Sequence, residues 1–322
     1  MCVAAILFVA ALGLASACKP SPQPASAPGV GQPLTGSVRV SGAWALYPMM
    51  VRWGEEYQKA HPGVRIDISA GGAGKGAADA LAGMVDIGMI SRNIKPEELK
   101  QGAAFIAVVK DAVFPTINAA NPALAQGLAE KGLKREQFID LYLHGKDVTW
   151  ETLVGAAGNS KVQVYTRSDS CGAAETWAQY LGAKAQEELQ GVGVYGDPGV
   201  AEAVRRDPLG IGFNNLNYAF DARTGKPAPG LRVLSIDVNG NGKIDPEEDL
   251  STKAAAIKAV LAGVYPSPPV RDLYLLTKDR FRGAAKEFVK WILRDGQKFV
   301  EEVGYIQLPA ETLKQAMGSL DK

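Results

Sequence analysis

The sequence predicts an α/β fold with two lobes and mainly parallel central sheets. Strand-like segments alternate with helical segments along most of the chain, a pattern typical of α/β proteins. Three strand-to-helix junctions consist mostly of small residues: GAWALYP at 42–48, GGAGKG at 71–76 and SDSCGAA at 168–174. The chain has 322 residues, 47% of them hydrophobic, and a chain of this length favours two lobes over one.

The expected strands are short apolar or alternating segments. In the first, at 36–42, Val38 and Val40 alternate with polar neighbours before a glycine. The others are expected at 64–68, 85–89, 105–109, 112–117, 162–165, 209–213, 231–236 and 273–276. Lys110 and Asp111 separate the expected strand at 105–109 from the one at 112–117.

The expected helices carry apolar residues at helical spacing on one face. The clearest, over 283–303, repeats them at Ala285, Phe288, Val289, Ile292 and Leu293. The remaining helices are expected at 47–61, 77–84, 95–100, 122–131, 135–144, 173–181, 199–206 and 253–262.

Charge and motif content exclude some functional classes. The 35 basic and 34 acidic residues are well mixed and give a net charge of +1, which argues against nucleic-acid binding through a general basic field. His61 and His144 stand alone, without metal-ligand spacing. The GGAGKG segment lacks the spacing of a nucleotide-binding P-loop and has Gly76 where Ser or Thr would bind magnesium.

The N-terminal region predicts export. Residues 1–17 are apolar, uncharged and end in small residues, as in a signal peptide, although the usual basic start is missing. LASAC at 14–18 resembles a lipobox, so we expect Cys18 to carry lipid; simple cleavage by signal peptidase is the alternative. Residues 18–36 then form the lipidated end and a Pro/Ser-rich tether. These features predict a membrane-anchored lipoprotein in the periplasm or at the cell surface.

The third junction, at 165–180, has the side chains expected of an anion site. It places the cation Arg167 and the carboxylate Asp169 before a turn and a helix, whose first N–H groups favour an anion. An ordinary strand-to-helix turn with an ion pair is the alternative. Cys171 lies within this junction, and a single thiol in an oxidising compartment must be buried or functional.

At this point the chain resembles the periplasmic phosphate-binding proteins of ABC transporters, which have the type II periplasmic-binding-protein fold. Four segments carry the resemblance, in the family's order: SGAWALYPMMVRWGEEYQKAHPGVRI, GGAGKGAADALAGMVDIGMISR, LYLHGKDVTW and RSDSCGAAETW. The resemblance implies two lobes joined by a hinge of two crossover strands. Lobe I is expected at 37–112 and 265–322 and lobe II at 113–264, with crossings near 110–117 and between 231 and 265.

The resemblance also implies roles for two side chains. Arg167 is expected to pair with phosphate oxygens. Asp169 is expected to accept a proton from bound phosphate and so to reject sulfate, because a carboxylate repels an oxyanion that has no proton to give.

The chain departs from the family's hydroxyl-rich loops. Cys171 and Ala173 replace a Ser and a Thr of the third loop, Ala73 replaces a Ser of the second, and the first loop has 43–46 AWAL. Backbone amides are expected to donate instead, with Arg92 adding charge after Ser91 and Lys75 either reaching the anion or remaining solvated. The oxyanion-binding residues expected are Ala45, Leu46, Tyr47, Ala73, Gly74, Lys75, Ser91, Arg92, Arg167, Asp169, Cys171, Gly172 and Ala173.

Residues 237–248 match an EF-hand calcium loop at every ligand position. The expected Ca²⁺ ligands, at positions 1, 3, 5, 7, 9 and 12, are Asp237, Asn239, Asn241, Lys243 through its carbonyl, Asp245 and Glu248. A strand precedes the loop where an EF-hand has a helix, so we expect a structural ion inserted in lobe II. An Asx-rich hairpin without metal is the alternative.

The leading hypothesis is a monomeric, non-enzymatic lipoprotein that captures phosphate or a similar tetrahedral oxyanion between two lobes and delivers it to an ABC transporter permease. One alternative is a calcium-dependent surface interaction protein with a vestigial anion pocket. The other is a hydrolase with Cys171 as nucleophile, for which no motif supplies a histidine base.

Overall fold

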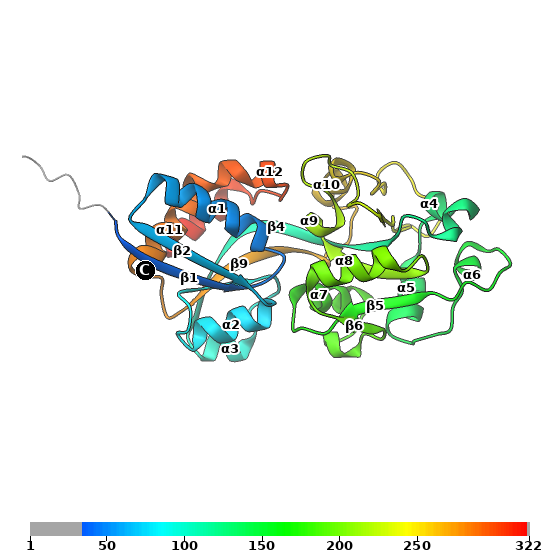
Figure 1. Cartoon of the computed structure of the whole chain (residues 1–322), viewed down its shortest axis with the longest axis horizontal. Helices are drawn as coiled ribbons and strands as arrows, with labels where there is room; N and C mark the ends of the chain where they lie inside the picture. Colours follow the sequence, from blue (N-terminus) through cyan, green and yellow to red (C-terminus); the bar gives the residue numbers. More distant parts are fainter. Residues whose placement is uncertain (1–33, 321–322) are drawn as a thin grey trace, which may run out of the picture. The chain divides into compact units, whose positions relative to one another are not determined.

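The computed structural model describes residues 34–320 (Figure 1). The predicted signal peptide and Cys18 therefore lie outside the described residues. The strands are β1 (Gly36–Gly42), β2 (Val64–Ala70), β3 (Ile87–Ile90), β4 (Ala103–Asn118), β5 (Gln163–Arg167), β6 (Val192–Val194), β7 (Gly210–Asn215), β8 (Leu231–Val233) and β9 (Val270–Lys278).

The helices agree with most of the expected positions. They are α1 (Tyr47–Ala60), α2 (Ala73–Leu81), α3 (Pro96–Lys100), α4 (Leu128–Lys131), α5 (Arg135–Tyr142), α6 (Trp150–Val154), α7 (Gly172–Leu181), α8 (Gly196–Arg206), α9 (Leu216–Ala219), α10 (Lys253–Leu261), α11 (Gly283–Arg294), α12 (Val300–Val303) and α13 (Ala310–Ser319). Two predicted helices are broken. Residues 122–131 form a 3₁₀ turn and the short α4, separated by Gly127 with φ of 87°. Residues 283–303 contain the 3₁₀ turn Gly296–Phe299 between α11 and α12.

The strands form one continuous sheet with the order β2-β1-β3-β9-β4-β7-β5-β6, and β8 also pairs with β4. Pairing is parallel between β1 and β2, β1 and β3, β5 and β6, and β5 and β7. It is antiparallel wherever β4 or β9 takes part. The predicted α/β class is confirmed: strand pairing is parallel at both ends of the sheet and antiparallel between them.

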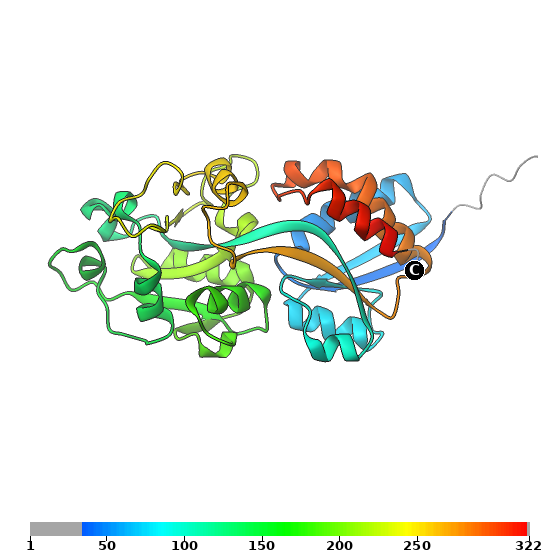
Figure 2. The same ribbon diagram turned by 180° about the vertical axis from the view of Figure 1, so that it is seen from behind.

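The long strand β4 links the two ends of the sheet. Its first half pairs with β9 and its second half with β7 and β8, and Figure 2 shows β4 and β9 side by side. The prediction of two strands broken at Lys110 and Asp111 is wrong. Both charges have partners on β9: Lys110 bonds to Asp272 at 2.5 Å, and Asp111 lies opposite Arg271. Paired charges do not interrupt a strand.

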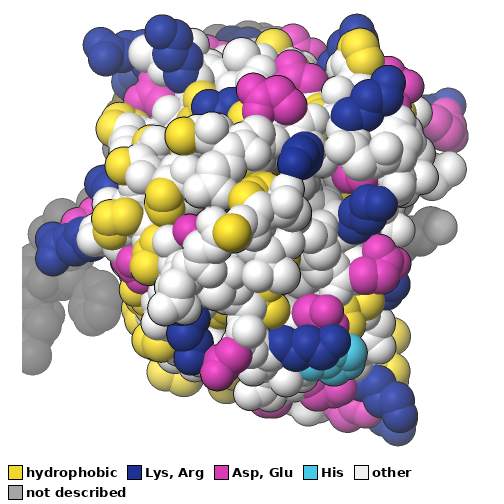
Figure 3. All heavy atoms as spheres, turned by 90° about the vertical axis from the view of Figure 1, so that its right-hand side faces the viewer, with side chains coloured by type: hydrophobic (Ala, Val, Ile, Leu, Met, Phe, Trp, Pro, Cys, Tyr) yellow, Lys and Arg dark blue, Asp and Glu magenta, His cyan; other side chains and the backbone are white. Residues whose placement is uncertain are grey.

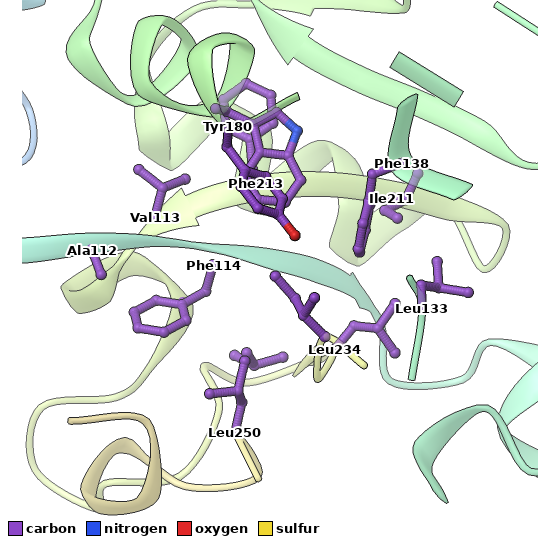
Figure 4. Packing of buried hydrophobic residues seen from close by; sticks show 14 of the residues in the cluster. Ala112, Val113, Phe114, Leu133, Phe138, Tyr180, Ile211, Phe213, Leu234 and Leu250 are labelled. Carbon is purple, nitrogen blue, oxygen red and sulfur yellow. The ribbon is translucent and has the colours of Figure 1, made fainter. Parts of the chain in front are cut away.

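Two large hydrophobic cores share the strands β4 and β9, and Val200, Ala201, Val204 and Leu231 form a small third cluster. The first, core I, draws on 38–109 and 273–320. The second, core II, draws on 112–270 and Ile306, and Figure 4 shows Phe114, Leu234 and Phe213 packed within it. The first changeover between the cores, between 109 and 112, falls at the expected crossing near 110–117. The second, between 270 and 273, lies on β9 and beyond the crossing expected between 231 and 265, because the chain returns from core II to core I only along that strand. The exact lobe boundaries stay a prediction.

On the face seen in Figure 3, cationic and anionic side chains are interspersed, so neither sign of charge dominates it. Within residues 34–320, no helix is both long enough and apolar enough to span a bilayer.

Candidate functional site

The second and third junctions touch each other in the structure. The amide of Gly74, at the start of α2, donates to the carbonyl of Ser170, which precedes α7, at 3.1 Å. Gly172, the first residue of α7, lies so close to Ser91 at the end of β3 that an added Cβ would be 2.5 Å from Ser91 Oγ. Only glycines allow this approach, so the two turns meet with little side chain between them.

The first junction closes over the same region. The indole of Trp44 lies against Gly196 at the start of α8 and makes an edge-on contact with Tyr195, with ring centroids 6.2 Å apart. The hydroxyl of Tyr218 donates to the Trp44 carbonyl at 3.2 Å. The structure thus brings the three predicted helix starts to one place between cores I and II.

Arg167 is the buried cation of this site. Its Nε and Nη2 donate to the two oxygens of Asp169 at 2.8 and 2.6 Å, and its Nη1 donates to Asp197 Oδ2 at 2.6 Å. The side chains of Arg167 and Asp197 are fully buried, and that of Asp169 is 5% exposed. A guanidinium has five N–H groups, so one on each Nη remains for a further acceptor.

The charges in this cluster are mutually stabilised. Burial disfavours the cation of Arg167, but Asp197 and Asp169 outweigh that effect and raise its pKa. Burial likewise disfavours ionised Asp169, yet hydrogen bonds from Arg167 hold the pKa of that carboxyl below its usual value. Asp169 therefore stays an ionised acceptor, and an added Cβ at Gly72 of the second junction would lie 2.9 Å from its Oδ2.

Three of the predicted amide donors have acceptors within the protein. The amides of Leu46 and Tyr47 donate to Ala43 and Trp44 at 3.1 and 3.2 Å, and Ala45 contributes its carbonyl to the hydroxyl of Tyr305 at 2.6 Å. The Gly74 amide donates across to Ser170, as described above. The amides of Ala73, Gly172 and Ala173 belong to first turns of α2 and α7, where helices offer no internal acceptor.

The predicted cations Lys75 and Arg92 are balanced by carboxylates. Lys75 is 47% exposed and bonds to Asp79 one turn along α2. Arg92 is 3% exposed, bonds to Glu98 through both Nη groups, and has Nε 3.3 Å from Glu175 of α7. Arg92 therefore links α3 to α7, and Lys75 corresponds to the solvated alternative.

Cys171 caps α7 and is not activated. Its thiol is buried and accepts from the amide of Ala174 at 3.4 Å. Burial raises the pKa of the thiol to about 12, against the opposing effect of Arg167. A nucleophilic role requires the thiolate, so this environment removes the basis of the hydrolase alternative.

Sequence reasoning missed the buried polar residues that support Arg167. Asp197 at the start of α8 accepts from the amide and side chain of Asn215, and Asn215 accepts from Arg271 on β9. These residues come from three distant segments with no shared motif. A carboxylate in the first turn of a helix, GDP at 196–198, was the only local signal.

The predicted calcium ligands form a loop tied by internal hydrogen bonds. Asp237 accepts from the amides of Asn241 and Gly242 at 3.1 and 2.8 Å, and Glu248 accepts from the amide of Asn239 at 3.2 Å. The side chains of Asn239 and Asn241 both donate to Asp245, and Lys243 Nζ lies 2.9 Å from it. Across residues 34–320, no three His, Cys, Asp or Glu side chains are gathered in a metal-binding arrangement. The donor types fit calcium, and the loop's occupancy stays a prediction.

Comparison with known proteins identifies the family. Residues 22–296 match the model of the PBP superfamily domain, which covers most of the chain. The chain belongs to the PBP superfamily. This is a superfamily of binding proteins, in agreement with the lobed α/β fold described above.

Relatives and solved structures agree with this membership. The chain is 26% identical to a phosphate-binding protein PstS of Methanocaldococcus jannaschii, over 90% of this chain and 87% of the relative. It is 28% identical to PstS of Bacillus subtilis, over 84% and 81%. A putative phosphate ABC transporter substrate-binding protein from Clostridium perfringens, solved with bound phosphate, superposes with a TM-score of 0.68 at 23% identity, over 85% of this chain and all of that one. The last likeness shows the shared fold.

Proposed function

We propose that this PBP-superfamily protein binds inorganic phosphate, or a similar tetrahedral oxyanion, between its two lobes. The observation that carries the proposal is the buried Arg167–Asp169 pair, which faces the glycine-rich second junction. The names of the relatives, PstS proteins from an archaeon and several bacteria, support the same ligand.

The geometry favours an oxyanion that still carries a proton. Arg167 retains one N–H on each Nη for two anion oxygens, and ionised Asp169 can accept a hydrogen bond but cannot donate one. Phosphate retains a proton near neutral pH, whereas sulfate has none to donate. An entering anion would accept a hydrogen bond from the Gly74 amide in place of the Ser170 carbonyl.

Delivery to an ABC transporter permease, export and lipid anchoring are parts of the same proposal. The relatives' names support phosphate binding, and the name of the Clostridium perfringens structure supports a partnership with an ABC transporter. The apolar 1–17 segment followed by LASAC supports attachment through Cys18. We further propose that the protein acts as a monomer. Mass spectrometry of the exported protein would detect the lipid, and light scattering would give its mass in solution; an unmodified Cys18 would contradict the anchor.

Calorimetry with phosphate, arsenate, sulfate, molybdate and tungstate tests the ligand directly. We expect phosphate and arsenate to bind and sulfate to fail. If no oxyanion binds at millimolar concentration, the proposal is wrong.

Two variants test the roles of the side chains. Arg167→Ala should abolish phosphate binding, whereas Arg65→Ala, which removes an exposed arginine paired with Asp67, should leave it unchanged. Asp169→Asn should admit sulfate, because an amide can donate where the carboxylate repels. Retained binding of phosphate alone in both site variants would contradict the assignment.

We also propose that the 237–248 loop holds a structural Ca²⁺. The support is the match at every ligand position, with Asp237 and Glu248 buried at 2% and 4% exposure. EDTA should lower the melting temperature and added calcium should restore it, with Asp237→Asn/Glu248→Gln as the insensitive control. Equal melting temperatures with and without EDTA would refute the ion. A binding partner that requires calcium, with no oxyanion bound, would instead favour the surface-interaction alternative.

A further inference from the structure

We propose that Arg271 is a positioning residue that couples closure of the two lobes to the orientation of Arg167. The inference rests on the proposed function, since it assigns Arg271 a role in holding the anion. Arg271 is not part of any junction that resembles the phosphate-binding family, and its role follows from its contacts alone.

Arg271 lies where the chain passes between the two cores. On β9, Val270 belongs to core II and Leu273 to core I. Its cross-strand partner Asp111 occupies the same position on β4, between Val109 of core I and Ala112 of core II. The two crossing strands therefore place one buried ion pair at the hinge.

The guanidinium of Arg271 contacts both sides of the cleft. Its Nε donates to the carbonyl of Ser91, at the end of β3, at 3.1 Å. Its Nη2 donates to the side-chain oxygen of Asn215, at the end of β7. Ser91 follows Ile90 of core I, and Asn215 precedes Leu216 of core II, so one side chain bridges the two lobes.

From Asn215 the contacts continue to the anion site. The backbone and side-chain nitrogens of Asn215 donate to Asp197 Oδ1 at 3.0 and 2.8 Å. The other oxygen of Asp197 accepts from Arg167 Nη1 at 2.6 Å. Asp197 and Arg167 are fully buried, so neither can turn to water for a replacement partner.

The ion pair itself is only partly satisfied. Arg271 Nη1 lies 3.3 Å from Asp111 Oδ2, and neither atom has a hydrogen-bond partner among the described residues. The orientation of Arg271 therefore depends on Ser91 and Asn215. Ser91 follows β3, which pairs with β9, whereas Asn215 ends β7 on the side of core II. When the lobes separate, Arg271 cannot keep both contacts, and the restraint on Asn215, Asp197 and Arg167 weakens. Lobe closure and the fixed orientation of Arg167, the side chain that binds the anion, therefore occur together.

The experiment compares Arg271→Met, Arg271→Lys and the surface control Arg65→Met with the unmodified protein. Stopped-flow and calorimetry with inorganic phosphate give association and dissociation rates, and small-angle scattering gives the radius of gyration with and without phosphate. We expect Arg271→Met to dissociate phosphate about tenfold to a hundredfold faster while its association rate changes less than about threefold. Arg271→Lys should behave similarly, because an ammonium cannot bond Ser91 and Asn215 in the same fork.

A purely structural role would lower the melting temperature without this division between the two rates. Dissociation rates in Arg271→Met equal to those of Arg65→Met would overturn the inference, even if phosphate binds. If the unmodified protein binds no phosphate, the proposed function fails separately, and scattering without phosphate decides the hinge role. A larger radius of gyration for Arg271→Met than for Arg65→Met supports that role, and equal radii overturn it.

Discussion

Gly172→Ala should block lobe closure without harming the helix that it begins. An ideal Cβ at this position would lie 2.5 Å from Ser91 Oγ and closer still to the Ser91 carbonyl oxygen. Ordinary Cβ contacts begin at 3.4 Å, so the start of α7 and Ser91 must separate by about 1.4 Å to relieve the contact with the carbonyl oxygen. The Ser91 carbonyl is backbone and is held by Arg271, so it cannot rotate away as a side chain would.

The expected loss of affinity follows from the contacts that this separation breaks. Losing two hydrogen bonds to a charged ligand, each contributing roughly 1.5–3 kcal/mol, weakens phosphate binding by about a hundredfold or more. Stability should change little, because alanine is a better helix former than glycine. Gly318→Ala in α13 is the matched control, since nothing lies within 4 Å of its added Cβ. Wild-type phosphate affinity in Gly172→Ala, measured by calorimetry, would refute the closed contact between Gly172 and Ser91.

Three further predictions concern charge and burial. Burial raises the pKa of Asp111 from 3.8 to about 6, so the folded state keeps a proton that the unfolded state has released. The contribution of Asp111 to the free energy of unfolding should fall by about 3 kcal/mol as pH rises from 4 to above 6, and urea titrations of the unmodified protein and of Asp111→Asn should differ in their pH dependence by about that amount. Because the pKa of Cys171 is about 12, iodoacetamide should alkylate it at pH 8 only in urea; rapid alkylation of the native protein, seen by mass spectrometry, would contradict its burial. Phosphate affinity should change less than about threefold between 50 and 500 mM NaCl, since Arg167 is fully buried and paired; a steep loss with salt would indicate recognition by an exposed positive field instead.

Local patterns in the sequence were sufficient to predict the strand-to-helix junctions. Alternation around Val38 and Val40 and the helical spacing in α11 both depend on neighbours a few residues away; β1 formed as expected, and α11 formed over the first part of the predicted helix. The continuity of β4 was not predictable in this way. Lys110 and Asp111 are tolerated inside that strand because Asp272 and Arg271, more than 150 residues later, lie beside them.

The same distinction applies to the site. Arg167 and Asp169 are two residues apart and were predicted as a pair, and the structure joins them by two hydrogen bonds. Asp197, Asn215 and Arg271 lie 30 to 104 residues further along the chain, and only folding joins them into a series of hydrogen bonds that ends at Arg167. Their roles are visible only once the partners of each buried atom are known.

The buried network explains how this site manages with few hydroxyl groups. Buried ion pairs contribute little net stability, because desolvation offsets most of their attraction. This chain nevertheless buries Arg167 with Asp169 and Asp197, and supports Asp197 with Asn215. The pairing fixes the orientation of the Arg167 guanidinium. Its Nε, Nη1 and Nη2 each have a fixed acceptor, so the remaining N–H group on each Nη also points in a fixed direction. On the proposed function, a rigidly held guanidinium takes a larger share of orienting the anion than it would in a site with hydroxyl-rich loops. The loss of the Ser and Thr side chains at Cys171 and Ala173 is then compatible with oxyanion binding, provided that the Asp197 and Asn215 support stays intact.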